Sequence, residues 1–463
     1  MIFSYMSMKK ILMSKVCLQP KIFCMTSKMK LILPVFFAFI LQGFAQNAEL
    51  KSGPMLGYSE MREVVVWLQT TSKGKVQLNY WNLEAPNKVF KSDVVETDAS
   101  AAFTTKIVLS LLEPGNKYGY QVVLNDKSLL FPYPLEFQTQ SLWQWRTDPP
   151  AFSIALGSCA YINDTPYDRP GKPYGSNYQI FESILSKKPD AMLWLGDNTY
   201  LREADWNSKS GIFYRYTHTR ATPELQGLLG SVHHYAIWDD HDFGPDNSDR
   251  GFIQKEATLE AFRLFWANPT SGLPEQEGIT SQFHWADIDF FLLDNRFSRA
   301  PDERKTGERT QFGKAQLEWL IDALKTSKSP FKMVATGGQF LSAAPTAENH
   351  IRFYPEERAY LIKRIEEEGL KNVIFLTGDR HFTELTELKL TNGKYIYDLT
   401  VSPLTSGVNT NPEINILRVP GTEVTEHNFG LLTFSGKRLE RKLTIKIFDA
   451  LGNEKWKKEI LSE

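Results

Sequence analysis

The chain has 463 residues, which is enough for two or three domains. Its composition, 42% hydrophobic, 13% aromatic and 23% charged, is that of a globular protein with a substantial core. The 53 Lys and Arg residues almost balance the 54 Asp and Glu residues, so the net charge is -1. Without a basic excess or a basic block, the chain has no general attraction to nucleic acids or anionic membranes, and we expect no nucleic acid as a structural partner.

The first 45 residues are expected to be an upstream segment and a signal peptide. Two lysines precede an apolar run at 31–41, which is too short to cross a bilayer, and a small-residue cleavage pattern ends at Ala45. No cysteine lies at or next to this cleavage site, so we expect no lipid anchor and no other stable membrane anchor. The mature protein would begin at Gln46, keep the single cysteine Cys159, and be exported to the periplasm or the extracellular space.

Residues 46–140 are predicted to form a small all-β domain. Short strand-like runs such as "REVVVWLQT" and "GKVQLNYW" alternate with turns. The spacing L-x-P-G-x-x-Y-x-Y resembles the tyrosine corner of a fibronectin-type-III-like sandwich. Its residues are Leu112, Pro114, Gly115, Tyr118 and Tyr120.

A Trp- and Pro-rich stretch at 141–150 is interpreted as a linker to a larger domain at 151–463. Helix-like runs such as "KAQLEWLIDALKTS" alternate there with strand-like runs such as "AMLWLGD", "FKMVATGG" and "NVIFLTGD". This alternation favours a layered α/β domain. The last stretch is predicted to be a β-hairpin with Gly452-Asn453 at its turn.

Polar side chains follow four of the predicted strands of this domain. They are Cys159, "GDNTY" (196–200), "DDHD" (239–242) and "GDRH" (378–381). A single Asp after a strand is more often a helix cap or a turn residue. Four such ends converge on one crevice of a layered α/β fold, however, and their clustered carboxylates repel unless a cation compensates them. The pattern therefore predicts a metal centre.

These motifs resemble those of the PhoD-like alkaline phosphatase family, within the calcineurin-like metallophosphoesterases. They are G-S-C, G-D-x-x-Y, W-D-D-H-D, D-x-R (Asp294, Arg296) and G-D-R-H, spread over about 150–435. The resemblance implies an α/β (α+β) fold of four layers, in which two packed β-sheets are flanked by helices, preceded by the fibronectin-type-III-like domain. It also implies a binuclear or trinuclear metal centre at the strand ends, with iron(III) and calcium(II), although other divalent metals remain open.

The chemistry of phosphate esters indicates how these residues divide between two metal sites. Two cations lower the pKa of water and neutralise phosphoryl oxygens, and one carboxylate must bridge them. Asp197 is the expected bridge. The first site would take the anionic ligands Cys159 and Tyr200, whose charge favours a trivalent ion, and the neutral imidazole of His381.

The second site is expected to be an all-oxygen site for a hard divalent ion. It would combine Asp197 and Asp379 with an oxygen from the loop within 236–247. The sequence leaves three candidates for that oxygen: Asp240, Asp246 and Asn247.

The expected catalytic residues are His241, Asp240 and Arg296. The pair Asp240-His241 stands where the superfamily has Asn-His, and His241 would hydrogen-bond the phosphate or protonate the leaving oxygen. The alternative is that His241 holds its loop together. Arg296 and Arg380 would either grip phosphate or neutralise the surplus carboxylates, and Asp294 would orient Arg296.

The sequence as a whole predicts an exported metal-dependent phosphoesterase, similar to alkaline phosphatase D, that acts on small phosphate esters through a metal-activated hydroxide. One alternative is a phosphodiesterase or phospholipase-type hydrolase on the same centre. Another is an inactive exported binding protein. Neither the choice between monoesters and diesters nor the oligomeric state can be read from the residues.

Overall fold

The computed structural model describes residues 48–346 and 349–463. The expected signal peptide at 1–45 lies outside this range. Within the described residues, no helix combines the length and the apolar character that crossing a membrane requires.

The largest sheet has nine strands in the order β21-β20-β19-β10-β11-β12-β1-β2-β6. Strands β10, β11 and β12 are parallel to one another, and β1 joins the free side of β12, also in parallel. The N-terminal strands therefore continue the sheet of the larger domain. Their bounds are β1 (Leu50–Ser59), β2 (Glu63–Thr70), β6 (Thr104–Ser110), β10 (Phe152–Gly157), β11 (Ala191–Leu195), β12 (His233–Ile237), β19 (Asn428–Ser435), β20 (Lys442–Asp449) and β21 (Glu454–Leu461).

A second sheet of six strands has the order β13-β14-β15-β16-β18-β17, with β14, β15, β16 and β18 parallel. It packs face to face against the first sheet, since Ile154 and Leu193 share one buried core with Met333 and Ile374. The bounds are β13 (Ser281–Trp285), β14 (Ile288–Leu292), β15 (Lys332–Ala335), β16 (Val373–Thr377), β17 (Glu384–Lys389) and β18 (Tyr395–Thr400).

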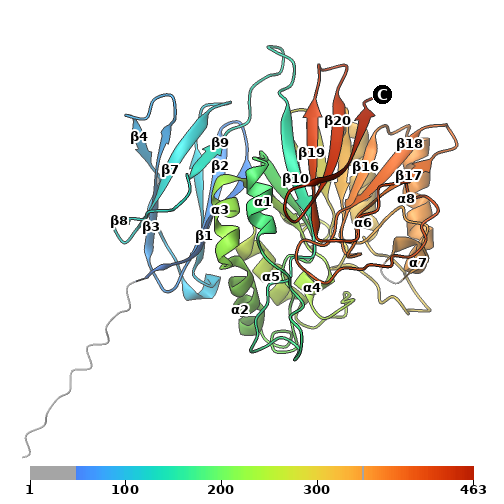
Figure 1. Ribbon diagram of the computed structural model, residues 1–463, viewed down its shortest axis with the longest axis horizontal. Helices are drawn as coiled ribbons and strands as arrows, with labels where there is room; N and C mark the ends of the chain where they lie inside the picture. The colour runs from blue at the N-terminus through green and yellow to red at the C-terminus, as the bar shows by residue number, and fades with distance from the viewer. Residues whose placement is uncertain (1–47, 347–348) are drawn as a thin grey trace, which may run out of the picture. The chain divides into compact units, whose positions relative to one another are not determined.

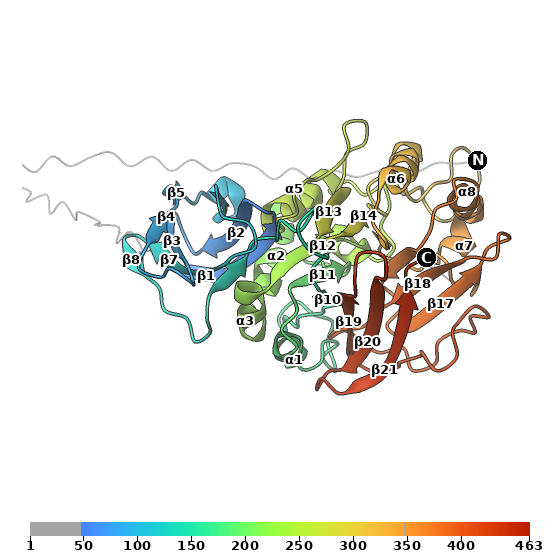
Figure 2. The ribbon, with the colours of Figure 1, turned by 90° about the horizontal axis from the view of Figure 1, so that it is seen from above.

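Helices cover the outer faces of both sheets, which gives four layers (Figures 1 and 2). Helices α1, α2, α3 and α5 lie on the first sheet, and α6 and α8 cover the second through Val334 and Phe375. The layered α/β arrangement is as predicted. The helix bounds are α1 (Ile180–Ser186), α2 (Lys209–Arg220), α3 (Pro223–Ser231), α4 (Asp240–Phe243), α5 (Lys255–Phe265), α6 (Lys314–Thr326), α7 (His350–Phe353) and α8 (Pro355–Glu367).

The N-terminal region is all-β, as predicted, with one short 3-10 turn, η1 (Ala99–Ala101). Its separate sheet packs on β1, β2 and β6 through a core that includes Val66 and Val122. At the proposed tyrosine corner, the Tyr118 hydroxyl accepts a hydrogen bond from the Glu113 N–H at 2.9 Å. The strands of the separate sheet are β3 (Lys75–Asn82), β4 (Val89–Lys91), β5 (Val95–Glu96), β7 (Lys117–Leu124), β8 (Lys127–Ser128) and β9 (Glu136–Gln138).

Candidate metal centre

The four strand ends identified in the sequence meet at one place. Cys159 follows β10, Asp197 follows β11, Asp239 follows β12 and Asp379 follows β16, and their donor atoms belong to groups in which all atoms lie within 4.8 Å of one another. Cys159, Asp197 and Asp379 have φ angles of 59°, 53° and 70°. Residues other than glycine are uncommon in this left-handed region, and they concentrate at functional sites. Here the conformation comes immediately after each strand, where the chain must turn.

The sulfur, phenol and imidazole expected at the first metal site lie together. The Cys159 Sγ is 3.7 Å from Asp197 Oδ2, the Tyr200 hydroxyl donates to the same oxygen at 3.1 Å, and His381 Nε2 is 3.5 Å from that hydroxyl. Burial lowers the pKa of His381 to about 4, so its imidazole is neutral at pH 7, the form that binds metals. Burial, with the charges of Asp197 and Asp379, raises the pKa of the Cys159 thiol well above its usual value. A thiolate at this position therefore needs a cation beside it.

Two serines that the sequence reasoning missed surround the same group. Ser402 Oγ donates to Cys159 Sγ at 3.1 Å and accepts from the backbone N–H of His381 at 3.0 Å. Ser406 Oγ lies 3.4 Å from His381 Nε2. Both serines follow β18, so the polar residues of "VSPLTS" after this strand were the sequence signal that could have placed them at the site.

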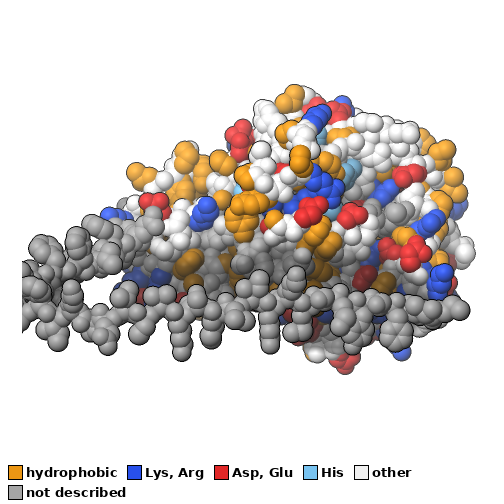
Figure 3. Space-filling view, turned by 90° about the horizontal axis from the view of Figure 1, so that it is seen from below, with side chains coloured by type: hydrophobic (Ala, Val, Ile, Leu, Met, Phe, Trp, Pro, Cys, Tyr) orange, Lys and Arg blue, Asp and Glu red, His pale blue; other side chains and the backbone are white. Residues whose placement is uncertain are grey.

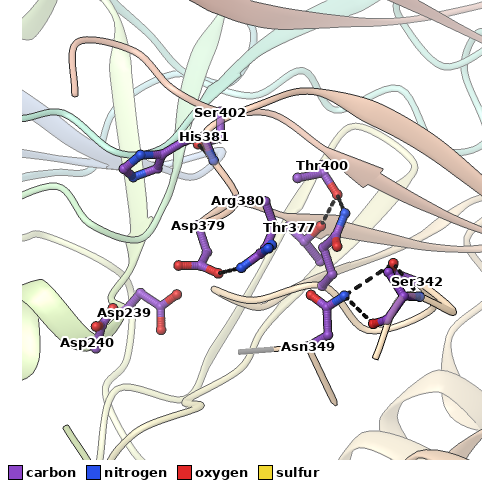
Figure 4. A network of polar contacts seen from close by, with 12 residues as sticks. Asp239, Asp240, Ser342, Asn349, Thr377, Asp379, Arg380, His381, Thr400 and Ser402 are labelled. Atoms are coloured by element: carbon purple, nitrogen blue, oxygen red, sulfur yellow. Dashed lines mark hydrogen bonds and ion pairs between the residues drawn. The ribbon is translucent and has the colours of Figure 1, made fainter. Parts of the chain in front are cut away.

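An all-oxygen group forms the other side of the site. One oxygen each from Asp239, Asp240 and Asp379 lies within 4.8 Å of the others, and Figure 4 shows the carboxylates of Asp239 and Asp379 directed toward each other. Asp239 was not among the predicted ligands, although it lies closest to the end of β12. Its Oδ1 accepts from Asn295 Nδ2 and Arg296 Nε at 2.7 and 2.5 Å, while its Oδ2 is buried without a hydrogen-bond partner.

The structure distinguishes the three loop residues that the sequence left open. Asp240 belongs to two donor groups, one of them with Asp197 and His241. Asn247 donates its backbone N–H to Asp240 Oδ2 at 2.6 Å, and its side-chain Oδ1 is buried without a partner. The side chain of Asp246 is 71% exposed and lies 3.6 Å from His241 Nε2. Asp240 and Asn247 are therefore better placed than Asp246 to bind a cation.

His241 lies between the two groups. Its ring stacks on Tyr200 with centroids 4.4 Å apart, and its backbone N–H donates to Asp197 Oδ1 at 3.3 Å. The Nδ1 atom of His241 is buried and has no hydrogen-bond partner. A buried nitrogen in this state is available to a metal or a substrate oxygen.

The electrostatics of the cluster fit bound cations. Burial raises the pKa of Asp197 well above its usual value, and the negative charges of Asp240, Asp239, Asp242 and Asp379 raise it further. Asp242 has a structural role, since it accepts the backbone N–H groups of Asn198, Thr199 and Asp239. Arg296 pairs with Asp239 and Asp240, and Arg380 lies 3.9 Å from Asp379, but the carboxylates of the cluster outnumber these two guanidinium groups. Together with the unpaired Asp239 Oδ2 and Asn247 Oδ1, this excess makes the donor set suitable for metal ions.

Arg296 takes the second of its two predicted roles. Its side chain is only 1% exposed and pairs with Asp239 at 2.5 Å and Asp240 at 3.5 Å, so it neutralises carboxylates and is not open to a substrate. Asp294, which was expected to orient Arg296, contacts the backbone of that residue. It accepts the N–H groups of Arg296 and Phe297 and thereby holds the turn after β14. Arg380 also pairs with acidic side chains, at 3.1 Å from Glu413 and 3.9 Å from Asp379 (Figure 4).

Arg296→Gln is expected to destabilise the protein by about 3–5 kcal/mol, because it leaves buried carboxylates without their cation. Urea unfolding of metal-free wild type and variant would measure the loss. Arg169→Gln, at an exposed ion pair with Glu203, is the matched control and should change stability by less than about 1 kcal/mol. A stable Arg296→Gln variant whose only defect is a raised KM would instead place Arg296 on the substrate.

Comparison with known proteins places this site in a family. Residues 154–432 match the model of the PhoD-like phosphatases, and residues 47–142 match a domain of unknown function, DUF7800. Alkaline phosphatase D of Bacillus subtilis (strain 168) is 23% identical over 342 residues, which are 64% of this chain and 56% of that protein. The chain thus spans little more than half the length of this curated relative.

Two solved structures share the fold. A structure of PhoD superposes with a TM-score of 0.71 and 18% identity, covering 89% of this chain and 92% of that one. The purple acid phosphatase PPD1 from yellow lupin (Lupinus luteus) seeds superposes with a TM-score of 0.64 and 12% identity, covering 89% and 74%. At such low identities, the two superpositions show that the fold is shared and show nothing finer. Since the family model matches more than half of its residues, the chain belongs to the PhoD-like phosphatase family.

Proposed function

We propose that the protein is an exported, metal-dependent phosphoesterase that resembles alkaline phosphatase D in activity. The observation that carries this proposal is the set of donor atoms at the strand ends, within a chain of the PhoD-like phosphatase family. When bound there, metal ions lower the pKa of water and neutralise the charge of a phosphoryl group. The substrates would be small phosphate esters.

The donors divide into two sites of different chemistry. Cys159, Tyr200 and His381 would hold the first cation, and their anionic sulfur and oxygen ligands favour iron(III). Asp240 and Asp379, joined by Asp239 and Asn247, would hold the second, and oxygen ligands favour calcium.

The position of Asp197 supports its role as the bridge. Its Oδ2 faces Cys159 and Tyr200, whereas its Oδ1 accepts from the backbone N–H of His241 on the side of Asp240. One carboxylate thus presents one oxygen to each group. His241, with its unpaired Nδ1, would hydrogen-bond the phosphoryl or leaving oxygen of the ester.

Elemental analysis of the purified chain, run beside assays with p-nitrophenyl phosphate and bis(p-nitrophenyl) phosphate, tests the proposal. We expect bound metal and hydrolysis of at least one ester, both abolished by chelation and restored by adding metal back. Metal-free protein with full activity, or metal-loaded protein inactive on both esters, would contradict it.

Two further parts of the proposal concern regions outside the site. The sandwich and the Tyr118 hydrogen bond support a fibronectin-type-III-like N-terminal domain. Export is supported by the sequence of residues 1–45. N-terminal sequencing of protein from the cell envelope or the medium should give a start near Gln46, and an intact 1–45 segment would refute cleavage.

A further inference from the structure

Tyr174 places an aromatic ring beside the metal centre, and the proposed reaction assigns no role to this ring. Its hydroxyl lies 3.3 Å from His381 Nδ1, and its ring is in edge contact with Tyr200, at 6.4 Å between centroids. Its ring also meets that of Tyr161 edge to face, with centroids 4.9 Å apart. Tyr161 and Tyr200 are buried behind it, but Tyr174 itself is 48% exposed. The exposed ring therefore borders the site on the side of His381.

Hydrogen bonds to the two residues that follow Tyr174, and packing against its ring, hold Tyr174 in place. Asn163 holds the next residue, Gly175, by two hydrogen bonds, since its Oδ1 accepts from the Gly175 N–H at 2.9 Å and its Nδ2 donates to the Gly175 carbonyl at 2.8 Å. The Ser176 N–H donates to the Thr405 carbonyl at 2.7 Å. A Cβ atom on Gly407 would come within 2.7 Å of the Tyr174 ring, so that glycine packs directly against it.

An exposed aromatic ring held in place beside a reaction centre is a preorganised binding surface. Such rings contribute binding energy through stacking with other rings, in addition to the apolar area that they bury. We propose that Tyr174 receives the alcohol portion of the phosphate ester, and that this portion carries a neutral planar ring, as in an aryl, benzyl or nucleoside ester. This assignment rests on the proposed phosphoesterase function.

A positive charge lies close to the aromatic cluster that contains Tyr174. The guanidinium carbon of Arg202 lies 5.7 Å from the centroid of Tyr161, the ring that Tyr174 contacts. This charge opposes the binding of a cationic alcohol such as choline, whereas it does not oppose a neutral ring.

Benzyl phosphate and cyclohexylmethyl phosphate test the inference, because their alcohols have seven carbons each and differ mainly in aromaticity. The quantity to measure is the ratio of their kcat/KM values in each variant divided by the same ratio in the wild type, so that the difference in intrinsic reactivity between the two esters cancels. Tyr174→Leu should lower the ratio about five-fold, the size expected for loss of one stacking contact. Tyr174→Phe should keep the ratio, although it removes the hydroxyl from His381 and lowers both rates together.

Two more variants make the result specific. Gly407→Ala should displace the ring and lower the ratio as Tyr174→Leu does. Tyr167→Leu, at a tyrosine of the same segment that is 49% exposed and packs on Tyr214, should leave the ratio unchanged.

An unchanged ratio in Tyr174→Leu would overturn the inference and leave Tyr174 as a positioning residue for His381. A loss in Tyr174→Leu that is larger for phosphocholine than for benzyl phosphate would also overturn it, in favour of a cationic alcohol. Failure of the wild type to hydrolyse any of these esters while it is loaded with metal would count against the phosphoesterase function itself.

Discussion

Asp197→Asn is expected to lower kcat by at least about a thousand-fold, which corresponds to about 4 kcal/mol of transition-state stabilisation. The substitution keeps the size of the side chain but removes the charge that both donor groups share. It should therefore weaken binding at both proposed metal sites. Steady-state kinetics and elemental analysis of the same preparation would measure the two losses together.

Asp322→Asn, at an exposed position of helix α6, is the matched control and should keep wild-type kcat and metal content. The metal-free Asp197→Asn protein should be at least as stable as metal-free wild type, since the substitution removes one of several repelling carboxylates. Retention of more than about a tenth of the wild-type kcat would remove Asp197 from the bridging role.

Cys159→Ser should weaken or abolish metal binding at the first site and lower activity in parallel, while the fold survives. The thiol is fully buried, and its pKa is raised by burial and by neighbouring carboxylates, so its ionised form depends on a bound cation. If that cation is iron(III), thiolate and phenolate ligands should give the wild type a visible charge-transfer band. The band should shift or vanish in Cys159→Ser.

Tyr200→Phe should also alter the band, because the Tyr200 hydroxyl contacts Asp197 and His381. Tyr161→Phe is the control, since its hydroxyl in the same buried cluster bonds to Asp168 instead. A colourless, fully active Cys159→Ser protein with unchanged metal content would show that the cysteine is a packing residue, and the first site would need other ligands.

The sequence was most informative where local pattern and final position coincide. Polar residues directly after buried strands predicted that Cys159, Asp197 and Asp379 would come together, because strand ends converge on one crevice in a layered α/β fold. The helix predicted from "KAQLEWLIDALKTS" is α6. In both cases, the residues whose pattern gave the prediction are the same residues that form the predicted site or helix.

Other features depend on contacts distant in the chain, which one sequence does not display. Ser402 reaches Cys159 across 243 positions, and nothing local to "VSPLTS" identifies that partner. The role of Arg296 depended on its burial against Asp239, which motif spacing alone does not fix. Strands β13 and β14, in "SQFHWADIDFFLL", went unpredicted beside more strongly patterned neighbours.

The pairing of β1 with β12 bears on how this protein can be divided. Leu56 lies opposite His233, and the Ser59 N–H donates to the hydroxyl of Tyr235 on β12. Removing residues 46–140 would leave β12, whose end carries Asp239, as a bare sheet edge, and such edges invite aggregation. The N-terminal region is thus not an independent module, and a protein that carried residues 151–463 without it would need a replacement for β1.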